Sequence, residues 1–144
     1  MQEYVVGFLF STDYHHVVMI RKAKPDWQAG KLNGVGGKIE PGETPLEAMI
    51  REGMEEMGVE VPWSPFARLT YSAADLYFFA AADAYSYAVA QTCEAEPIEK
   101  WAWRGLLEFA PLADDNLRWL VPLALYHLRR EKPVVGTLTL GLAS

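Results

Sequence analysis

The sequence predicts an α/β domain in which a mixed β-sheet lies between helices. Two observations support this prediction. Short apolar runs of strand length recur in both halves of the chain, and two longer segments carry the capping residues and apolar stripe of amphipathic helices. The 144 residues, of which 51% are hydrophobic, are enough for one compact domain, and no repeat or linker divides residues 1–144.

The first part of the chain predicts a β-hairpin. Residues 4–10 and 17–21 are β-rich and flank a Ser-Thr-Asp turn cluster. A connector over residues 21–31 follows, with four cations and Trp27. The aromatic face of Trp27 could stack on a base, or it could cap the core. Three glycines within residues 32–38 then allow either a close approach of the backbone to a ligand or a bend in a strand.

Residues 45–57 carry the clearest helix pattern. Thr44 provides an N-cap hydroxyl, Pro45 occupies the first helical position, and Glu47 completes a capping box. Gly58 supplies a left-handed stop, because glycine adopts that conformation without steric cost. The predicted apolar stripe consists of Leu46, Met49, Ile50, Gly53 and Met57.

Three carboxylates gather on a neighbouring side of this helix. At about 100° per residue, Glu52, Glu55 and Glu56 surround one small volume. Like charges at this spacing destabilise a helix by roughly 0.2–0.5 kcal/mol per pair unless a cation offsets them. Oxygen ligands without nearby His or Cys suit Mg²⁺ or Mn²⁺ rather than Zn²⁺. For these glutamates alone, a solvated acidic face is the alternative interpretation.

More strands are expected after the helix. Residues 66–72 and 76–82 have strand patterns, and the second is almost wholly apolar, which favours a central position in the sheet. A loop over residues 92–97 then leads to an aromatic strand around Trp101 and Trp103.

The C-terminal part predicts a second helix and a last strand. Residues 114–116 can cap a helix that runs to about Arg130. Pro122 removes one backbone hydrogen bond inside this helix, so we expect a kink or a late start. Residues 134–140 would form the last strand.

Charge and cysteine content exclude several classes of function. The formal net charge of −6 disfavours a broad surface for DNA or RNA. The N-terminal apolar run lacks preceding basic residues and is too short to span a membrane, so we expect no targeting segment. The single Cys93 excludes an internal disulfide and is typical of a reduced, cytoplasmic protein. We therefore expect a small-molecule partner, and a monomer or homodimer.

The glutamates belong to a longer pattern, formed in order by Gly37, Glu43, Arg51, Glu52, Glu55, Glu56, Gly58 and Val59. This pattern resembles the Nudix box, the motif of the Nudix hydrolases, and matches it at every position fixed to one residue type. Gly53 departs at a looser position, where the family normally has an apolar side chain that packs the helix onto the sheet. Glycine there costs about 1 kcal/mol relative to alanine and leaves space beneath the helix.

The resemblance implies the family's α/β/α sandwich and its reaction, the metal-dependent hydrolysis of a nucleoside diphosphate linked to another group. Carried over by position, the three box glutamates would hold Mg²⁺ or Mn²⁺ together with the carbonyl oxygen of Gly36. Nudix enzymes often recruit one more carboxylate from a later loop. The candidate here is Glu96, ahead of Glu94 and Glu99.

The resemblance also implies roles for charged residues around the metal. Arg51 and Glu43 would form an ion pair that orients the helix. Glu52 or the loop carboxylate would take a proton from the attacking water. Lys38 or Arg21 could help to hold phosphate.

The glycine-rich stretch before the box looks like that of MutT-type members of the family, which clear oxidised purine nucleoside triphosphates such as 8-oxo-dGTP. This resemblance implies that Asn33 reads the base and that Trp27 lines its pocket. Asp115 and Asn116, or Asp114 and Asp115, would contact the purine edge, which their hydrogen-bonding groups permit. Plain helix capping is the alternative for these residues.

Other functions stay open at this point. Within the hydrolases, a dinucleoside polyphosphate or a nucleotide sugar could be the substrate. The domain could also be a nucleotide-binding sensor that has lost catalysis, although such domains usually lose box glutamates and all are present here. A few relatives are isomerases of prenyl diphosphates, but Cys93 lies in no suitable local pattern.

Overall fold

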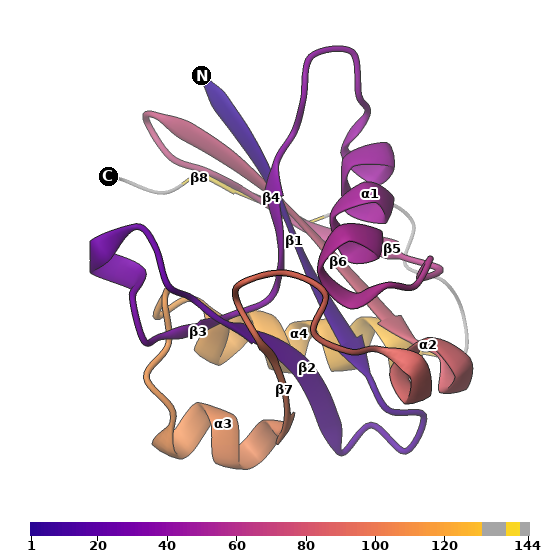
Figure 1. Cartoon of the computed structure of the whole chain (residues 1–144). Coiled ribbons are helices and arrows are strands. Elements are labelled where there is room, and N and C mark those ends of the chain that lie inside the picture. Colours follow the sequence, from indigo (N-terminus) through magenta and orange to yellow (C-terminus); the bar gives the residue numbers. More distant parts are fainter. Residues whose placement is uncertain (131–137, 142–144) are drawn as a thin grey trace.

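The computed structural model describes residues 1–130 and 138–141, and these form a mixed β-sheet between two layers of helices (Figure 1). The predicted α/β layered architecture is therefore confirmed. The strands are β1 (Gln2–Phe10), β2 (His16–Arg21), β3 (Leu32–Asn33), β4 (Val35–Lys38), β5 (Ser64–Thr70), β6 (Ala74–Ala82), β7 (Ile98–Ala102) and β8 (Leu138–Gly141). The helices are η1 (Asp26–Gln28), α1 (Pro45–Met57), α2 (Ala84–Val89), α3 (Trp103–Phe109) and α4 (Leu117–Arg129).

Strand β1 is the centre of the sheet. It runs parallel to β6 over its whole length and antiparallel to β2, within the order β3-β2-β1-β6-β5-β8. The N-terminal half of β1 pairs with β4, with Val5 opposite Gly37 and Val6 opposite Gly36. The glycine-rich stretch is therefore a strand in the middle of the fold. The predicted hairpin and the central position of the apolar strand β6 are also confirmed.

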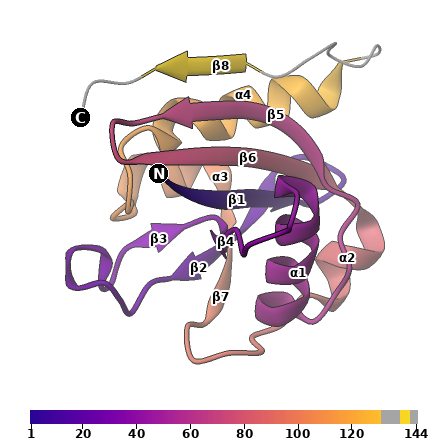
Figure 2. The same cartoon turned by 90° about the horizontal axis from the view of Figure 1, so that it is seen from above.

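The two faces of the sheet bury different side chains. Residues of β1 point alternately to the two sides, as the period of a strand requires. Phe8 and Phe10 lie in the core that α4 covers, whereas Val5 and Leu9 lie in the core beneath α1. Figure 2 shows α1 and α4 on opposite sides of the sheet.

Helix α1 begins and ends where the sequence predicts. The hydroxyl of Thr44 accepts a hydrogen bond from the Glu47 amide at 3.1 Å, and the Glu47 carboxylate accepts one from the Thr44 amide at 3.1 Å. Gly58 closes the helix with a φ of 77°. The predicted stripe is correct except that Leu46 is 43% exposed, while Ala48 is fully buried.

The prediction that Trp103 belongs to a strand is wrong. Strand β7 pairs with β2 only as far as Ala102, which lies opposite His16. Residues before His16 leave the sheet and form the hairpin loop between β1 and β2. In this loop the carbonyl of His15 accepts a hydrogen bond from the Trp103 amide. With no ladder to continue, the chain enters α3.

Helix α2 differs from the sequence-based expectation, whereas α4 and the described part of β8 agree with it. The short helix α2 was not predicted, although Asp83 caps it by accepting a hydrogen bond from the Ser86 amide at 3.0 Å. Helix α4 starts at Leu117 and continues through Pro122 to Arg129. Strand β8 pairs in parallel with β5, and residues 134–137 of the predicted last strand lie outside the described residues. In the described ranges, no helix is long and apolar enough to cross a membrane.

Candidate active site

The carboxylates of α1 lie against the glycine-rich strand β4. A Cβ atom built on Gly37 would lie 2.5 Å from Oε1 of Glu52, and one built on Gly36 would overlap the carbonyl oxygen of Val5. A larger residue at Gly36 would displace strand backbone, and one at Gly37 would push the Glu52 carboxylate aside. The glycines therefore let a helix carboxylate rest directly on strand backbone.

Glu56 is a buried acid in this contact. Its side chain is 4% exposed, and Oε1 accepts a hydrogen bond from the Gly36 amide at 3.0 Å. Burial, together with the neighbouring charge of Glu52, raises the pKa of Glu56 to about 8. Burial also raises the pKa of Glu52. Two acids that resist ionisation in one buried volume favour a cation beside them.

Arg51 organises the outer edge of this cluster. Its guanidinium donates to both carboxylate oxygens of Glu43, at 2.7 and 3.0 Å, and to the Lys38 carbonyl at 3.0 Å. It also donates to Glu52 at 3.0 Å and makes longer contacts with Glu55, the nearest at 3.3 Å. The pair with Glu43 is of the bidentate, charge-assisted type that fixes geometry well. Arg51 thus ties the loop before α1 to the helix and to the strand.

The donor set fits a hard divalent ion in its chemistry. Glu56 offers a buried carboxylate and Glu52 a partly buried one, Glu55 adds a carboxylate that is 45% exposed, and the carbonyl of Gly36 lies in the adjoining strand. Across residues 1–130 and 138–141, however, no three acidic, His or Cys side chains converge as they would around an ion. The reason is that Arg51 holds Glu55 and Glu52, while Glu56 bonds to the Gly36 amide. A bound cation would have to draw Glu55 away from a weak contact.

The predicted loop ligand Glu96 has other partners in the structure. It accepts hydrogen bonds from Nζ of Lys22 at 3.0 Å, from the Ala23 amide at 2.5 Å and from the Lys24 amide at 3.3 Å. It is therefore tied to the connector between β2 and β3. The charge of Lys22 also offsets part of the rise in the pKa of Glu56. Sequence reasoning missed Lys22, since nothing in its spacing separates it from the other cations of the connector.

The two candidate phosphate ligands differ in their surroundings. Arg21 donates to both oxygens of Glu99, at 2.7 and 2.8 Å, and to the Gly30 carbonyl at 2.9 Å. Its charge is therefore already compensated by a carboxylate. Lys38 is exposed at the end of β4, beside the carboxylate cluster. The positive patch expected from the connector is accordingly weaker than its composition suggests.

The candidate base-binding residues come from three segments, two of which meet. The amide of Leu32 donates to the Pro111 carbonyl at 2.8 Å, and the Ala113 amide donates back to the Leu32 carbonyl at 2.9 Å. These bonds bring Asn33 to the segment that precedes α4. Trp27 lies on η1 and is 63% exposed, so it does not cap the core.

The start of α4 holds a network of polar side chains. The side-chain amide nitrogen of Asn116 donates to the Tyr71 hydroxyl at 3.0 Å, and its amide oxygen accepts from the Trp119 indole at 2.8 Å. The Tyr71 hydroxyl donates to Asp114 at 3.3 Å. Asp115, in contrast, is 96% exposed along its side chain. The side chain of Asn116 is thus bound at both ends by residues that the sequence did not single out, instead of capping the helix.

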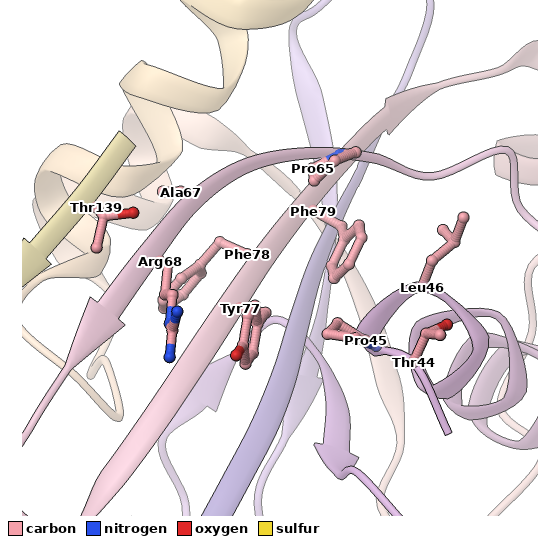
Figure 3. A pocket seen from close by; sticks show the side chains of 10 residues that line it. All are labelled: Thr44, Pro45, Leu46, Pro65, Ala67, Arg68, Tyr77, Phe78, Phe79 and Thr139. Carbon is pink, nitrogen blue, oxygen red and sulfur yellow. The ribbon is translucent and has the colours of Figure 1, made fainter. Parts of the chain in front are cut away.

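A groove of about 410 Å³ lies elsewhere, between the start of α1 and strands β5 and β6 (Figure 3). Figure 3 shows Arg68 and Tyr77 side by side on neighbouring strands, and the Arg68 guanidinium lies 4.9 Å from the Tyr77 ring centroid. Asp75 compensates the charge of Arg68 at 2.5 Å. None of the three box glutamates is among the described residues that line this groove, so the groove is separate from the carboxylate cluster. We place the candidate active site at the cluster. The lining residues are Thr44, Pro45, Leu46, Pro65, Ala67, Arg68, Tyr77, Phe78, Phe79 and Thr139.

Comparison with known proteins identifies the family. A family model described as "NUDIX domain" matches residues 1–130, and the chain therefore belongs to this family. Among curated proteins, the chain is similar to the 8-oxo-dGTP diphosphatase of Escherichia coli (strain K12), with 37% identity over 68 residues. That match spans 46% of this chain and 53% of the relative, or about half of each.

Solved structures agree with the fold. The match to a MutT structure, from work on Aliivibrio salmonicida and Vibrio cholerae, covers 87% of this chain and 97% of the matched chain, with a TM-score of 0.71 and 21% identity. The match to the NUDIX domain of Shewanella oneidensis NrtR, solved in complex with ADP ribose, covers 88% of this chain and 87% of the matched chain, with a TM-score of 0.73 and 22% identity. At such identity these likenesses establish the α/β/α sandwich, and they leave the substrate open.

Proposed function

We propose that this protein is a Mg²⁺-dependent pyrophosphohydrolase that acts on nucleoside triphosphates. Water would add across one phosphoanhydride bond, and the products would be a nucleoside monophosphate and pyrophosphate. The observation that carries the proposal is the pair of partly buried Glu52 and buried Glu56, which rest on Gly37 and Gly36 in a chain of the NUDIX family. Mn²⁺ has the same preference for oxygen ligands and is the alternative ion.

The cluster supplies the ligands that such a reaction needs. Glu52, Glu55, Glu56 and the Gly36 carbonyl would hold the ion. When bound, a divalent ion neutralises phosphate oxygens and lowers the pKa of a bound water. Arg51, which donates to Glu43 and Glu52, would keep the helix carboxylates oriented during turnover.

Several side chains could serve proton transfer and phosphate binding. Glu52 would accept a proton from the attacking water, and burial supports this role because it raises the pKa of Glu52 above the ordinary value of a glutamate. Glu96 could do so, or could bind the ion, only after releasing Lys22. Lys38 is the exposed cation beside the cluster, and Arg21 would need to leave Glu99 to reach a phosphate.

We further propose an oxidised purine nucleotide, such as 8-oxo-dGTP, as the substrate. Support comes from the partial match to a curated 8-oxo-dGTP diphosphatase and from the position of the candidate base contacts. Trp27 is exposed on η1, as a stacking residue must be, and Asn33 lies beside the segment that holds Asp114. Asp115 is exposed, with only a 3.9 Å ion pair to Arg118, and could meet the purine edge, whereas Asn116 would do so only by exchanging its present partners.

The surroundings of the enzyme follow from the same proposal. A small nucleotide would be its partner, without nucleic acid or membrane, and the reaction would take place in the cytoplasm. The protein would act as a monomer or a homodimer. The net charge of −6 accords with a site where metal ions, rather than a broad basic surface, offset the substrate's charge.

The test is an activity panel with the purified protein. Ordinary and oxidised nucleoside triphosphates, dinucleoside polyphosphates, nucleotide sugars and ADP-ribose are incubated with Mg²⁺, and pyrophosphate and phosphate release are measured. We expect pyrophosphate from an oxidised purine triphosphate, and no release when EDTA replaces Mg²⁺. Turnover of only the larger diphosphates would contradict the triphosphate assignment, and inactivity throughout would favour a nucleotide-binding sensor.

A further inference from the structure

The indole of Trp63 fills a slot between two glycines on facing elements. A Cβ atom built on Gly53 of α1 would lie 3.3 Å from the indole nitrogen and 3.5 Å from Cζ2. A Cβ atom built on Gly7 of β1 would lie 2.8 Å from Cη2 of the same ring. Trp63 is 7% exposed, and its indole nitrogen has no hydrogen-bond partner among the described residues. The ring therefore acts through its shape, with glycine on both sides making room for it.

This packing corrects the expectation of empty space at Gly53. The volume beneath the middle of α1 is taken up by a side chain from the connector that follows the helix. Met49 completes the contact, since its Cε and Sδ also lie 2.9 Å from the Cβ built on Gly7. Helix α1 thus rests on β1 through the Trp63 ring, and the size of the ring determines the height of the helix.

The slot lies in the same turns of α1 as the metal-site carboxylates. Glu52 immediately precedes Gly53, and Glu56 follows it by one helical turn. Both carboxylates contact β4, which pairs with β1 beside Gly7. A change in the height of α1 would therefore change the distance between these carboxylates and the glycine strand.

We propose that Trp63 is a positioning residue for the cation site. Its indole, seated between Gly53 and Gly7, sets the spacing between α1 and the sheet and so holds Glu52 and Glu56 against Gly36 and Gly37. The inference rests on the proposed function in that the carboxylates must bind a divalent ion. Its geometric part, the height of α1, can be measured without any metal.

The test removes the Trp63 ring from the slot and fills the slot instead with a side chain on α1. Trp63→Ala empties it, Gly53→Leu overfills it, and the double variant fills it again from the helix. Mn²⁺ affinity is measured by electron paramagnetic resonance well below the unfolding temperature. We expect about tenfold weaker binding for each single variant, because residues that orient ligands have effects of this order. The double variant should return to within about threefold of wild type, since contacting residues couple.

A second readout needs no metal. The Gly36 amide donates to Glu56, so its proton chemical shift reports the distance between α1 and β4. The shift should move in both single variants and return in the double variant. Trp63→Phe keeps a ring in the slot and loses no hydrogen bond, so both readouts should stay near wild type. If Trp63→Ala does not fold, Trp63→Leu with and without Gly53→Leu replaces it.

A matched control separates positioning from general stability. Phe66→Leu removes part of a buried ring from the opposite face of the sheet and should lower the unfolding temperature without changing either readout. A loss of Mn²⁺ affinity in Phe66→Leu equal to that in the Trp63 variants, or no recovery in the double variant, would overturn the proposal. Wild-type protein that binds no Mn²⁺ would refute the proposed function. The Gly36 shift would then still decide whether Trp63 sets the height of α1.

Discussion

The two faces of the sheet use opposite kinds of packing. Beneath α4, the rings of Phe8, Phe66 and Phe78 form a triangle with centroids 6.1 to 6.3 Å apart. Beneath α1, glycines bring backbone, an indole ring and two carboxylates into direct contact. The first face buries large apolar area, which is the main source of stability. The second brings buried acids together, at a cost in stability, which makes it the face suited to a cation.

This difference teaches that the two faces should respond to different perturbations. Changes on the α4 face should lower stability and spare the site. Changes to the carboxylates on the α1 face should alter metal binding, with small or even favourable effects on the stability of the metal-free protein.

The largest effect on stability is expected from the aromatic face. Phe66→Ala removes a ring that is 3% exposed and should cost about 3–5 kcal/mol of unfolding free energy. Denaturant unfolding measures the loss, and KM at a temperature where the variant is folded should match wild type. A change in KM at unchanged stability would show that the two faces are not separable in this way.

On the carboxylate face, Glu56→Gln should lower kcat by about 10²–10³-fold, as the loss of one key electrostatic group does. The metal-free protein should be as stable as wild type or more so at neutral pH, because the unfolded chain no longer gains free energy by ionising a carboxyl that the folded protein keeps protonated. Glu60→Gln, an exposed glutamate just beyond the helix, is the matched control and should keep full activity. Wild-type kcat in both Glu56→Gln and Glu55→Gln would refute the metal assignment.

Trp27 lies on neither face and tests the site's rim. Trp27→Ala should raise KM for purine triphosphates, and the binding free energy should fall by about 1–3 kcal/mol if the ring stacks on the base. Its side chain is exposed, so the melting temperature should hardly change. A fall in melting temperature with an unaltered KM would assign Trp27 a structural role.

The pH dependence of stability should also come from the α1 face. The pKa of Glu56 is raised to about 8 in the folded state, against an ordinary value of 4.5. The folded protein keeps a proton that the unfolded chain releases, so the contribution of Glu56 to stability is fully present below pH 4.5 and is lost as the pH rises toward 8. The slope approaches about 1.4 kcal/mol per pH unit for one group. Thermal melts in EDTA from pH 5 to 8 should show this fall in wild type and a smaller one in Glu56→Gln.

Local sequence signals predicted the parts of the fold that local chemistry determines. The capping box at Thr44 and the glycine stop at Gly58 specified α1, because caps act within a few residues. The prediction failed at Trp103, where the end of the ladder depends on how far β2 extends. No local pattern contains that information, since the two strands are distant in sequence.

The candidate site likewise has parts that a short motif predicts and parts that depend on tertiary contacts. The carboxylates on one helix and the Arg51–Glu43 pair follow from spacing in a short motif. The partners of Glu96 and Arg21 do not, because Lys22 and Glu99 reach them from segments more than seventy residues away in the chain. The filling of the slot at Gly53 by Trp63 is likewise a tertiary contact.

The most direct test of the cation site is the number of protons released when the protein binds Mn²⁺ at pH 7. Isothermal titration in buffers of different ionisation enthalpy gives this number. Because the pKa of Glu56 is raised to about 8, wild type should release nearly one proton for each ion bound at the site, and Glu56→Gln should release almost none. Saturable binding by wild type without proton release, or equal release by the variant, would contradict a cation site built on the buried glutamate pair.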